Sequence, residues 1–335
     1  MSKKRKLTIV ILSAVLIFIL CTVGILILVA NSQNDNRAPT KELSQWMSMI
    51  KDETLLKKVV IPGAHDAGTA GMLYLAETQD RSIADLLACG TRYFDLRVSK
   101  TKDGQLKIFH GPIKGVTLDC VLEQITQFLE ENTSEALILD FHHFENGAEQ
   151  DTKAKVLNLP VVRAQGDFVQ FVDNLTLGEV RGKCLILWGP DSADGEVFLR
   201  RNNDEATVEQ SALQSYYEGR LNKKSSSTYV KKVLQLYIDK YKEHDSGLFV
   251  LQGQLTDGVF VFGPHFREAT HNKNMNKYVV NLQYSDDFDV INIIMRDYVS
   301  PHKNCLTLLL NLAKDNVKQE HVNAFESMLG ENLHA

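Results

Sequence analysis

Residues 118–144 read LDCVLEQITQFLEENTSEALILDFHHF and combine two kinds of apolar pattern. In residues 118–132 the apolar side chains recur at spacings of three and four, which is typical of a helix with one buried face. Residues 136–144 are instead a short run of consecutive apolar residues that ends in polar ones. Such a run indicates a strand buried on both faces. The stretch therefore predicts a helix followed by a buried strand, which is the repeating unit of α/β proteins.

The same alternation extends in both directions along the chain. Helical spacing recurs at 82–90 and 229–244. Further apolar runs are KKVVIPG (57–63), TRYFDLRV (91–98), LKIFHGP (106–112), GKCLILWGP (182–190), GLFVLQGQL (247–255) and VINIIMRDYV (290–299). Buried strands joined by helices predict a parallel sheet covered by helices, and this many strands favour a barrel over an open sheet. We predict one α/β domain at 54–335, a TIM-like (βα) barrel.

The N-terminal part has a different composition. After the basic residues 1–6, residues 7–30 carry no charge, and at ~1.5 Å per residue they are long enough to cross the ~30 Å apolar core of a bilayer. The basic end favours a cytoplasmic tail, which predicts a single-pass type II signal-anchor with an extracellular or lumenal barrel. A signal peptide cleaved between Ser32 and Gln33 is the alternative. Residues 31–53 read as a tether that ends in a surface helix at 43–50.

Composition excludes some classes of partner. The chain has 335 residues, of which 24% are charged, and a formal net charge of -5. With no basic stripe beyond the first six residues, nucleic acid is not an expected partner. The five cysteines are widely spaced and lack the close pairs of a zinc site, so no structural metal is expected. Export would permit disulfides, but the spacing leaves their pairing open.

Polar residues stand at the ends of the predicted strands, where the active site of a barrel forms. They are His65 and Asp66, Asp95 and Arg97, His110, Asp140 and His142, and Asp297. Each alone has a structural explanation: Asp66 could cap a helix, Asp95 could pair with Arg92 or Arg97, and Asp297 could cap a turn. For His65, Arg97 and His110 together, convergence at three successive strand ends favours a functional site.

Two histidines and an arginine suit the cleavage of a phosphodiester by a neighbouring hydroxyl group. One histidine can take the hydroxyl proton, the other can protonate the departing oxygen, and the guanidinium can offset charge on the phosphoryl oxygens. No metal cofactor is required for this chemistry.

Several of these segments resemble the X-region of phosphatidylinositol-specific phospholipases C, including the stand-alone X-domain proteins related to bacterial secreted enzymes. The matching segments are IPGAHDAGT (61–69), GTRYFDLRV (90–98), HGP (110–112), LILDFHHF (137–144), QGQLT (252–256) and NIIMRDYV (292–299). The resemblance covers roughly residues 55–300. It implies an irregular TIM barrel that cleaves phosphatidylinositol-type lipids to diacylglycerol and a cyclic inositol phosphate.

The resemblance also implies roles for residues. His65 is the general base for the inositol 2-hydroxyl, His110 is the general acid, and Asp297 orients His65. Arg97 and Asp66 stabilise the phosphate. Further residues at the same strand ends are candidates for binding the substrate: Asp95, Asp140 and His142.

The resemblance bears on cofactor and head group as well. Calcium-dependent relatives have acidic residues where this chain has Arg97, so a guanidinium is expected in place of the ion. Bacterial relatives hold the inositol ring with a lysine and an arginine after the next two strands, where this chain offers only His142, Trp188 and Asp191 as positional candidates. The head group is therefore open between phosphatidylinositol, a glycosylated form and another phosphodiester. A catalytically idle lipid-binding module and a metal-dependent glycerophosphodiester hydrolase are the alternative classes, and the latter would favour a glutamate-rich site that 61–69 lacks.

Overall fold

The computed structural model describes residues 38–162, 172–189, 199–200, 212–255 and 263–334, together with Leu12, Ser13, Val15 and Ile17. The chain divides into two units, Met1–Asp35 and Asn36–Ala335, and the second contains the fold described below. None of the helices within the described residues is both long enough and apolar enough to cross a membrane. Apart from those four positions, the predicted span at 7–30 lies outside the described residues, as do residues 31–37 of the tether.

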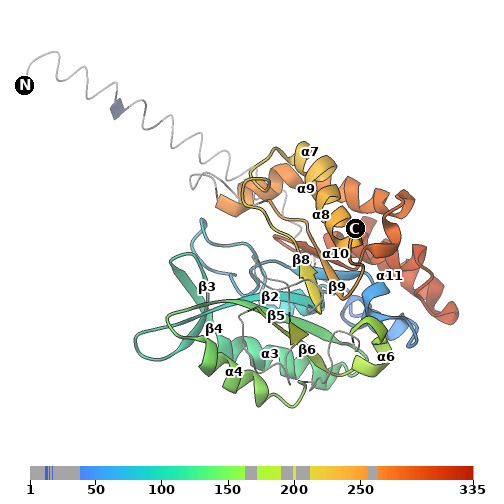
Figure 1. The fold of residues 1–335 in the computed structure, drawn as a ribbon, viewed down its shortest axis with the longest axis horizontal. Coiled ribbons are helices and arrows are strands. Elements are labelled where there is room, and N and C mark those ends of the chain that lie inside the picture. Colours follow the sequence, from blue (N-terminus) through green and yellow to red (C-terminus); the bar gives the residue numbers. More distant parts are fainter. Residues whose placement is uncertain are drawn as a thin grey trace, which may run out of the picture. The chain divides into compact units, whose positions relative to one another are not determined.

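A curved parallel sheet forms the centre of the second unit (Figure 1). Its strands follow the order β7-β6-β5-β2-β1-β10-β9-β8, and every neighbouring pair on this path is parallel. The bounds are β1 (Ile61–Ala64), β2 (Tyr93–Lys100), β5 (Leu137–Glu145), β6 (Cys184–Trp188), β7 (Leu199–Arg200), β8 (Leu213–Ser215), β9 (Leu248–Gln252) and β10 (Ile293–Arg296). Within the described residues β7 does not pair with β8, so the sheet is not closed. The predicted α/β class is confirmed, with a TIM-like barrel that stays open.

One predicted strand runs in the wrong direction for a barrel strand. β3 (Leu106–His110) pairs antiparallel with β2 and continues into a hairpin with β4 (Ile113–Thr117). The turn between β2 and β3 contains Gly104 at φ +86, a conformation that favours glycine. The expectation that His110 ends a parallel strand is therefore wrong. The antiparallel return, with Ile108 opposite Val98, nevertheless brings His110 back beside β2.

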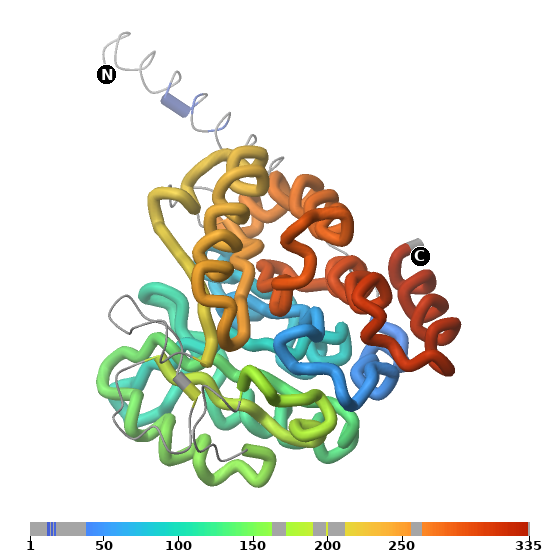
Figure 2. Tube along the Cα trace, turned by 45° about the vertical axis from the view of Figure 1, so that its right-hand side comes forward, coloured from blue at the N-terminus to red at the C-terminus, as the bar shows by residue number. Residues whose placement is uncertain are grey.

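Helices flank the sheet. The longer ones are α3 (Leu118–Glu131), α4 (Glu149–Leu157), α8 (Leu234–Lys242), α9 (Gly263–Asn281), α10 (Pro301–Ala313) and α11 (Val322–His334). The shorter ones are η1 (Glu42–Met49), η2 (Leu56–Lys58), α2 (Ile83–Ala88), α6 (Leu177–Val180), α7 (Ser226–Thr228), η4 (Tyr229–Val233), η5 (Leu282–Tyr284), η6 (Phe288–Val290) and η7 (Gln319–His321). The helices predicted at 82–90, 118–132 and 229–244 are confirmed, and the one at 43–50 is a 3-10 helix. The C-terminal helices pack beside the start of the domain (Figure 2).

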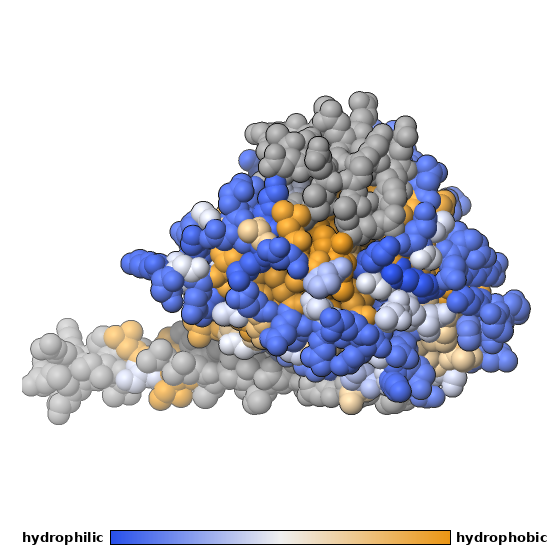
Figure 3. Space-filling view, turned by 90° about the horizontal axis from the view of Figure 1, so that it is seen from below, coloured by the Kyte–Doolittle hydropathy of each residue, from blue (hydrophilic) through white to orange (hydrophobic). Residues whose placement is uncertain are grey.

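The strands are buried on both faces because neighbouring side chains alternate between two apolar clusters. On β2, Tyr93 belongs to one cluster and Phe94 to another. Hydrophilic residues border the apolar area at its sides and lower edge on the face shown in Figure 3. This double burial explains why the strands appear in the sequence as continuous apolar runs.

The structure tests two of the structural explanations for the polar residues. The N-cap of α2 is Ser82, so the explanation that Asp66 caps the helix that follows it is wrong. The Arg92 guanidinium is fully buried and paired with Glu135 at 2.7 Å, which leaves Arg97 as the partner of Asp95.

Candidate active site

The chain turns sharply where β1 ends. Asp66 has φ 45 and Gly68 has φ +86, so two residues within three positions adopt the left-handed conformation. The Asp66 amide donates to Asp95 Oδ2 at 3.2 Å, which holds this turn against β2. A Cβ atom at Gly63 would lie 2.9 Å from Tyr93 Cδ1, so the strand needs glycine to approach β2. The small residues of IPGAHDAGT therefore aim His65 and Asp66 into one site.

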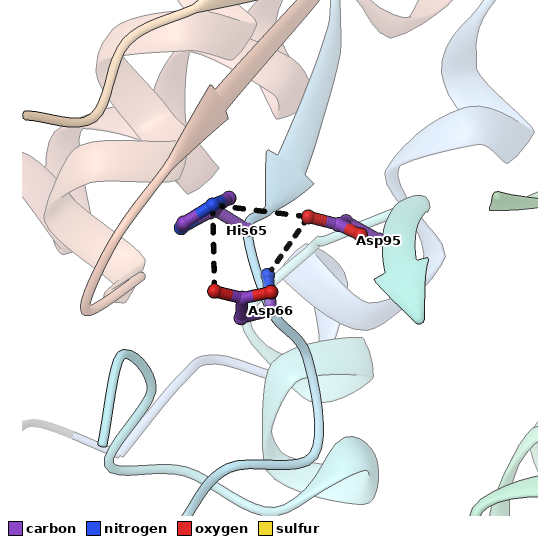
Figure 4. Close-up of side chains that lie close together, drawn as sticks. All are labelled: His65, Asp66 and Asp95. Carbon is purple, nitrogen blue, oxygen red and sulfur yellow. Dashed lines mark hydrogen bonds and ion pairs between the residues drawn. The ribbon is translucent and has the colours of Figure 1, made fainter. Parts of the chain in front are cut away.

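His65 is held by carboxylates on both of its ring nitrogens. Its Nδ1 lies 2.7 Å from Asp297 Oδ1. Its Nε2 lies 3.4 Å from Asp66 Oδ2 and 3.9 Å from Asp95 Oδ2 (Figure 4). Since the Asp297 carboxylate accepts the Nδ1 proton, the neutral ring presents an unprotonated Nε2, to which Arg97 Nη2 can donate at 3.2 Å.

These contacts change the pKa values of the group. Burial disfavours the charged ring, but the carboxylates of Asp66 and Asp297 more than offset it and raise the pKa of His65 to about 9. Burial also raises the pKa of Asp297, although His65 partly offsets this effect. For Asp95, burial opposes ionisation, but His142, Arg97 and His65 hold the pKa of its carboxyl well below the usual range.

Arg97 provides the positive charge at the centre of the site. It lies within β2 where the register with β5 shifts, and not at the strand end. Its Nε pairs with Asp66, and its Nη2 lies 3.5 Å from Asp95 Oδ2. Burial disfavours its charge, but the two carboxylates raise the pKa of Arg97 above its usual value. The guanidinium is thus permanently charged, and its side chain remains 21% exposed to an incoming substrate.

His110 approaches the same carboxylate from the β3–β4 hairpin. Its Nδ1 donates to Ala76 O at 2.8 Å, so Nε2 is the nitrogen that faces the site. That Nε2 lies 3.6 Å from Asp66 Oδ2. The Nε2 atoms of His65 and His110 therefore both converge on Asp66, next to Arg97.

Three other candidates form a buried row beside the site. His142 Nδ1 lies 3.3 Å from Asp95 Oδ1 and 3.6 Å from Asp140 Oδ1. Asp140 is fully buried and accepts a hydrogen bond from the Tyr93 hydroxyl at 2.5 Å. It therefore contacts other residues of the site but has no surface exposed to solvent. A Cβ atom at Gly189 would lie 2.6 Å from His142 Cβ, which leaves glycine as the residue that fits there.

Of the two remaining positional candidates, Trp188 does not line the site. Trp188 is buried and packs against Phe141 and Phe144, with ring centroids 5.7 and 4.7 Å away. Asp191 lies outside the described residues.

Sequence reasoning missed residues that bind the site's backbone. Gln79 is fully buried, and its Nε2 donates to His65 O at 2.8 Å and to Arg296 O at 2.9 Å. Its Oε1 accepts from the Val299 amide at 3.0 Å. Gln79 thereby joins the ends of β1 and β10. No pattern in the sequence distinguishes it from an ordinary loop glutamine.

Among the described residues, His65, Asp66 and Asp95 offer ligand atoms within 4.8 Å of one another, which is the spacing of a possible metal site. The Arg97 guanidinium is already paired with both carboxylates. A cation at this position would have to displace it, so the donor set fits an arginine in place of a metal.

Comparison with known proteins defines the class. The fold is similar to the phosphatidylinositol-specific phospholipase C of Listeria monocytogenes, with a TM-score of 0.60 and 23% identity over 80% of this chain and 98% of that one. It is also similar to the corresponding Staphylococcus aureus enzyme, with a TM-score of 0.62 and 17% identity over 84% of this chain and 100% of that one. The fold is therefore that of the bacterial enzymes, an α/β barrel of TIM-like form.

Sequence comparison finds similarity to the same class of enzymes. Residues 54–187 match the model of the phosphatidylinositol-specific phospholipase C, X domain. The 1-phosphatidylinositol phosphodiesterase of Listeria monocytogenes is 29% identical over 86% of this chain and 90% of its own length. Human PI-PLC X domain-containing protein 2 is 36% identical over a shorter match, 27% of this chain and 30% of that protein. Residues 54–187 are therefore similar to the X domain of phosphatidylinositol-specific phospholipases C, and most of the chain is similar to the Listeria phosphodiesterase.

Proposed function

We propose that the protein cleaves phosphatidylinositol-type lipids by intramolecular attack of the inositol 2-hydroxyl, which gives diacylglycerol and a cyclic inositol phosphate. The observation that carries this proposal is the convergence of His65 Nε2 and His110 Nε2 on Asp66, beside Arg97. The match of residues 54–187 to the X-domain model and the similarity to the Listeria enzyme support phospholipase activity of this general type.

His65 acts as the general base. The Asp297 carboxylate binds the proton on Nδ1 and leaves the Nε2 lone pair to accept the proton of the 2-hydroxyl. The same carboxylate stabilises the imidazolium that forms when the oxygen attacks phosphorus.

His110 acts as the general acid, and Arg97 stabilises the phosphoryl oxygens. When the bond from phosphorus to the glycerol oxygen breaks, His110 Nε2 donates its proton to that oxygen and releases diacylglycerol. The Ala76 carbonyl keeps the other ring nitrogen protonated, so Nε2 is the nitrogen that loses the proton. Asp66 fixes the position of the Arg97 guanidinium. This guanidinium stabilises the negative charge that develops on the phosphoryl oxygens.

Assay of the purified chain on phosphatidylinositol vesicles tests this function. Phosphorus NMR is expected to show a cyclic inositol phosphate as the first product, with and without EDTA. Parallel assays on glycosylated phosphatidylinositol and on glycerophosphodiesters identify the head group, with His142 and Asp95 as the side chains proposed to contact it. Binding to vesicles without turnover of any of these substrates would contradict the proposal and leave a lipid-binding module.

Exposed apolar side chains near His110 suit a substrate that lies in a membrane. Leu73 and Leu75 are 67% and 45% exposed, and they stand on the same loop as Ala76, which binds His110. Burying one leucine contributes about 1.5–3 kcal/mol, and 1.4 kcal/mol corresponds to about tenfold in binding. Leu73→Asp is therefore expected to lower the rate on vesicles by about tenfold or more, while the rate on a soluble short-chain substrate stays unchanged.

Leu157→Asp is the matched control, because Leu157 is 41% exposed but lies at the end of α4, near the amino ends of the strands. Equal effects of Leu73→Asp on vesicles and on soluble substrate would show that the loop does not contact the membrane.

We also propose that residues 7–30 anchor the barrel to a membrane as a single-pass type II segment, with the barrel extracellular or lumenal. The support is the absence of charge over these residues and the basic residues before them. In sealed microsomes, which enclose the lumen, the chain is expected to resist alkaline extraction, keep its full mass and have its barrel protected from external protease. Recovery as a shortened soluble chain would instead support the cleaved signal peptide.

A further inference from the structure

A second buried charge cluster holds the backbone that carries Asp297. The Lys303 ammonium group donates to three oxygen atoms: Glu268 Oε1 at 2.7 Å, Asp297 O at 3.1 Å and Tyr298 O at 2.7 Å. All three of its protons are therefore used. The side chains of Lys303 and Glu268 are only 7% and 3% exposed. The pair thus links α9 and α10 to the segment between β10 and α10.

The position of Lys303 is unfavourable by local rules. It lies in the first turn of α10, two residues after Pro301, where the helix dipole disfavours a cation. Burial lowers the pKa of Lys303, although Glu268 partly offsets this effect. Burial likewise disfavours the Glu268 carboxylate, but Lys303 and Arg296 lower its pKa and keep it charged. The three oxygen atoms that Lys303 binds offset the cost of burying its charge at the start of a helix.

Tyr298, the residue after Asp297, has a strained backbone. Its φ is 46, in the left-handed region that a bulky residue rarely adopts. Its amide donates to Thr78 O at 2.8 Å, while its carbonyl accepts from Lys303. Lys303 also binds the Asp297 carbonyl, so the peptide groups on both sides of Tyr298 accept hydrogen bonds from one ammonium group. Without it, the strained turn directly after Asp297 loses the donor that its two carbonyl groups share, and the Asp297 side chain can move away from His65.

We propose that Lys303, with Glu268 as its buried counter-ion, is a positioning residue that keeps the Asp297 carboxylate 2.7 Å from His65 Nδ1. This inference rests on the proposed role of His65 as the base. It makes α9 and α10, which lie outside the matched residues 54–187, part of the active-site support. The charged and titratable groups around His65 are Asp66, Asp95 and Arg97, and those beside Glu268 are Arg296 and His271.

Histidine-selective NMR on the full-length chain in detergent micelles tests the inference, with the His65 resonance assigned from its loss in His65→Ala. The decisive variant combines Glu268→Met with Lys303→Met, which removes one charge of each sign and leaves the net charge unchanged. Buried ion pairs are often replaced by apolar residues without loss of folding. Arg296, which also pairs with Glu268 at 3.2 Å, keeps its hydrogen bonds to the Asn276 and Asn272 side chains in this variant. The pKa of His65 is expected to fall by about one unit or more toward its ordinary value of ~6.5, and kcat to fall by about 10- to 100-fold with little change in KM.

The single variant Lys303→Met distinguishes two effects on the pKa of His65: the loss of a nearby positive charge and the loss of the contact with Asp297. Loss of a nearby positive charge would by itself raise the pKa of His65, whereas loss of the Asp297 contact lowers it. A lower pKa is expected. Lys314→Met is the matched control, since Lys314 ends the same helix and donates to Asp289 O at 3.0 Å and Ile291 O at 2.7 Å. It is expected to leave the pKa of His65 and kcat unchanged.

The inference is overturned if the double variant keeps the wild-type pKa of His65 while Asp297→Asn lowers it. It is also overturned if Lys303→Met raises that pKa. Because the NMR measurement does not depend on turnover, an inactive wild-type chain would contradict the proposed function and still leave the positioning role tested. Should the double variant not fold, the sign of the shift in Lys303→Met decides.

Discussion

Replacing His65 with alanine is expected to lower kcat on phosphatidylinositol by about 10³- to 10⁴-fold, because the 2-hydroxyl loses its general base. His110→Ala removes the general acid and is expected to cost about 10²- to 10⁴-fold on the same lipid. KM is expected to change little in either variant, since neither imidazole supplies the main contacts to the lipid chains. Steady-state assays on mixed micelles measure both effects, and circular dichroism shows whether each variant is folded.

A substrate with an acidic leaving group separates the two roles. An aryl inositol phosphate releases a phenolate that needs little protonation, so His110→Ala is expected to recover most of the wild-type rate on it. His65→Ala is expected to remain slow, because the attacking hydroxyl is the same in both substrates. If the rate on the aryl inositol phosphate recovers in His65→Ala and not in His110→Ala, then His110 is the base and His65 is the acid.

The pH dependence of kcat/KM follows from the same pair. His65 must be neutral to act as base, and its pKa is raised to about 9. A pKa of about 9 lies two units above pH 7, so at neutral pH only about one molecule in a hundred has the neutral ring. The acidic limb of the profile is therefore expected near pH 9, and Asp297→Asn is expected to move it to lower pH because one stabilising carboxylate is lost. An acidic limb near 6.5 in the wild type would show that the carboxylates do not act on His65.

The fold class could be predicted because local signals agree with the tertiary structure. Each buried parallel strand appears as a continuous apolar run, and α3 has the spacing of a helix with one buried face. The exception is β3. Its apolar pattern is the same for a parallel and an antiparallel neighbour, and only the turn around Gly104 distinguishes a hairpin from a crossover. Whether a strand is parallel or antiparallel depends on the strand with which it pairs. The periodicity of its own apolar residues does not identify that partner.

The site could be predicted in its centre but not in its support. His65, Arg97 and His110 are unusual residue types beside apolar runs, and the structure brings them together around Asp66. Lys303 and Glu268 belong to ordinary helical patterns. Their relation to Asp297 exists only after α9 and α10 pack beside β10. Contacts that form only when helices pack beside the sheet cannot be predicted from the spacing of residues in the sequence.

Arg97→Met is expected to lower kcat by about 10²- to 10³-fold, because it removes the positive charge that meets the phosphoryl oxygens. It also leaves Asp66 and Asp95 without their shared cation, which typically costs about 3–5 kcal/mol for a buried pair. Urea unfolding measures this second effect separately from catalysis. Arg97→Lys is the matched control: it keeps the charge but loses the planar fork, so an intermediate rate is expected.

The same guanidinium predicts how the wild-type enzyme responds to chelators. Arg97 neutralises the carboxylates whose oxygen atoms would otherwise bind a divalent cation, so full activity is expected in EDTA. Loss of activity in EDTA that calcium restores would mean that an ion displaces Arg97 from Asp66 in the working enzyme. In that case Arg97→Met would keep its activity in the presence of calcium, whereas a guanidinium that acts directly on the phosphate leaves the variant slow at every calcium concentration.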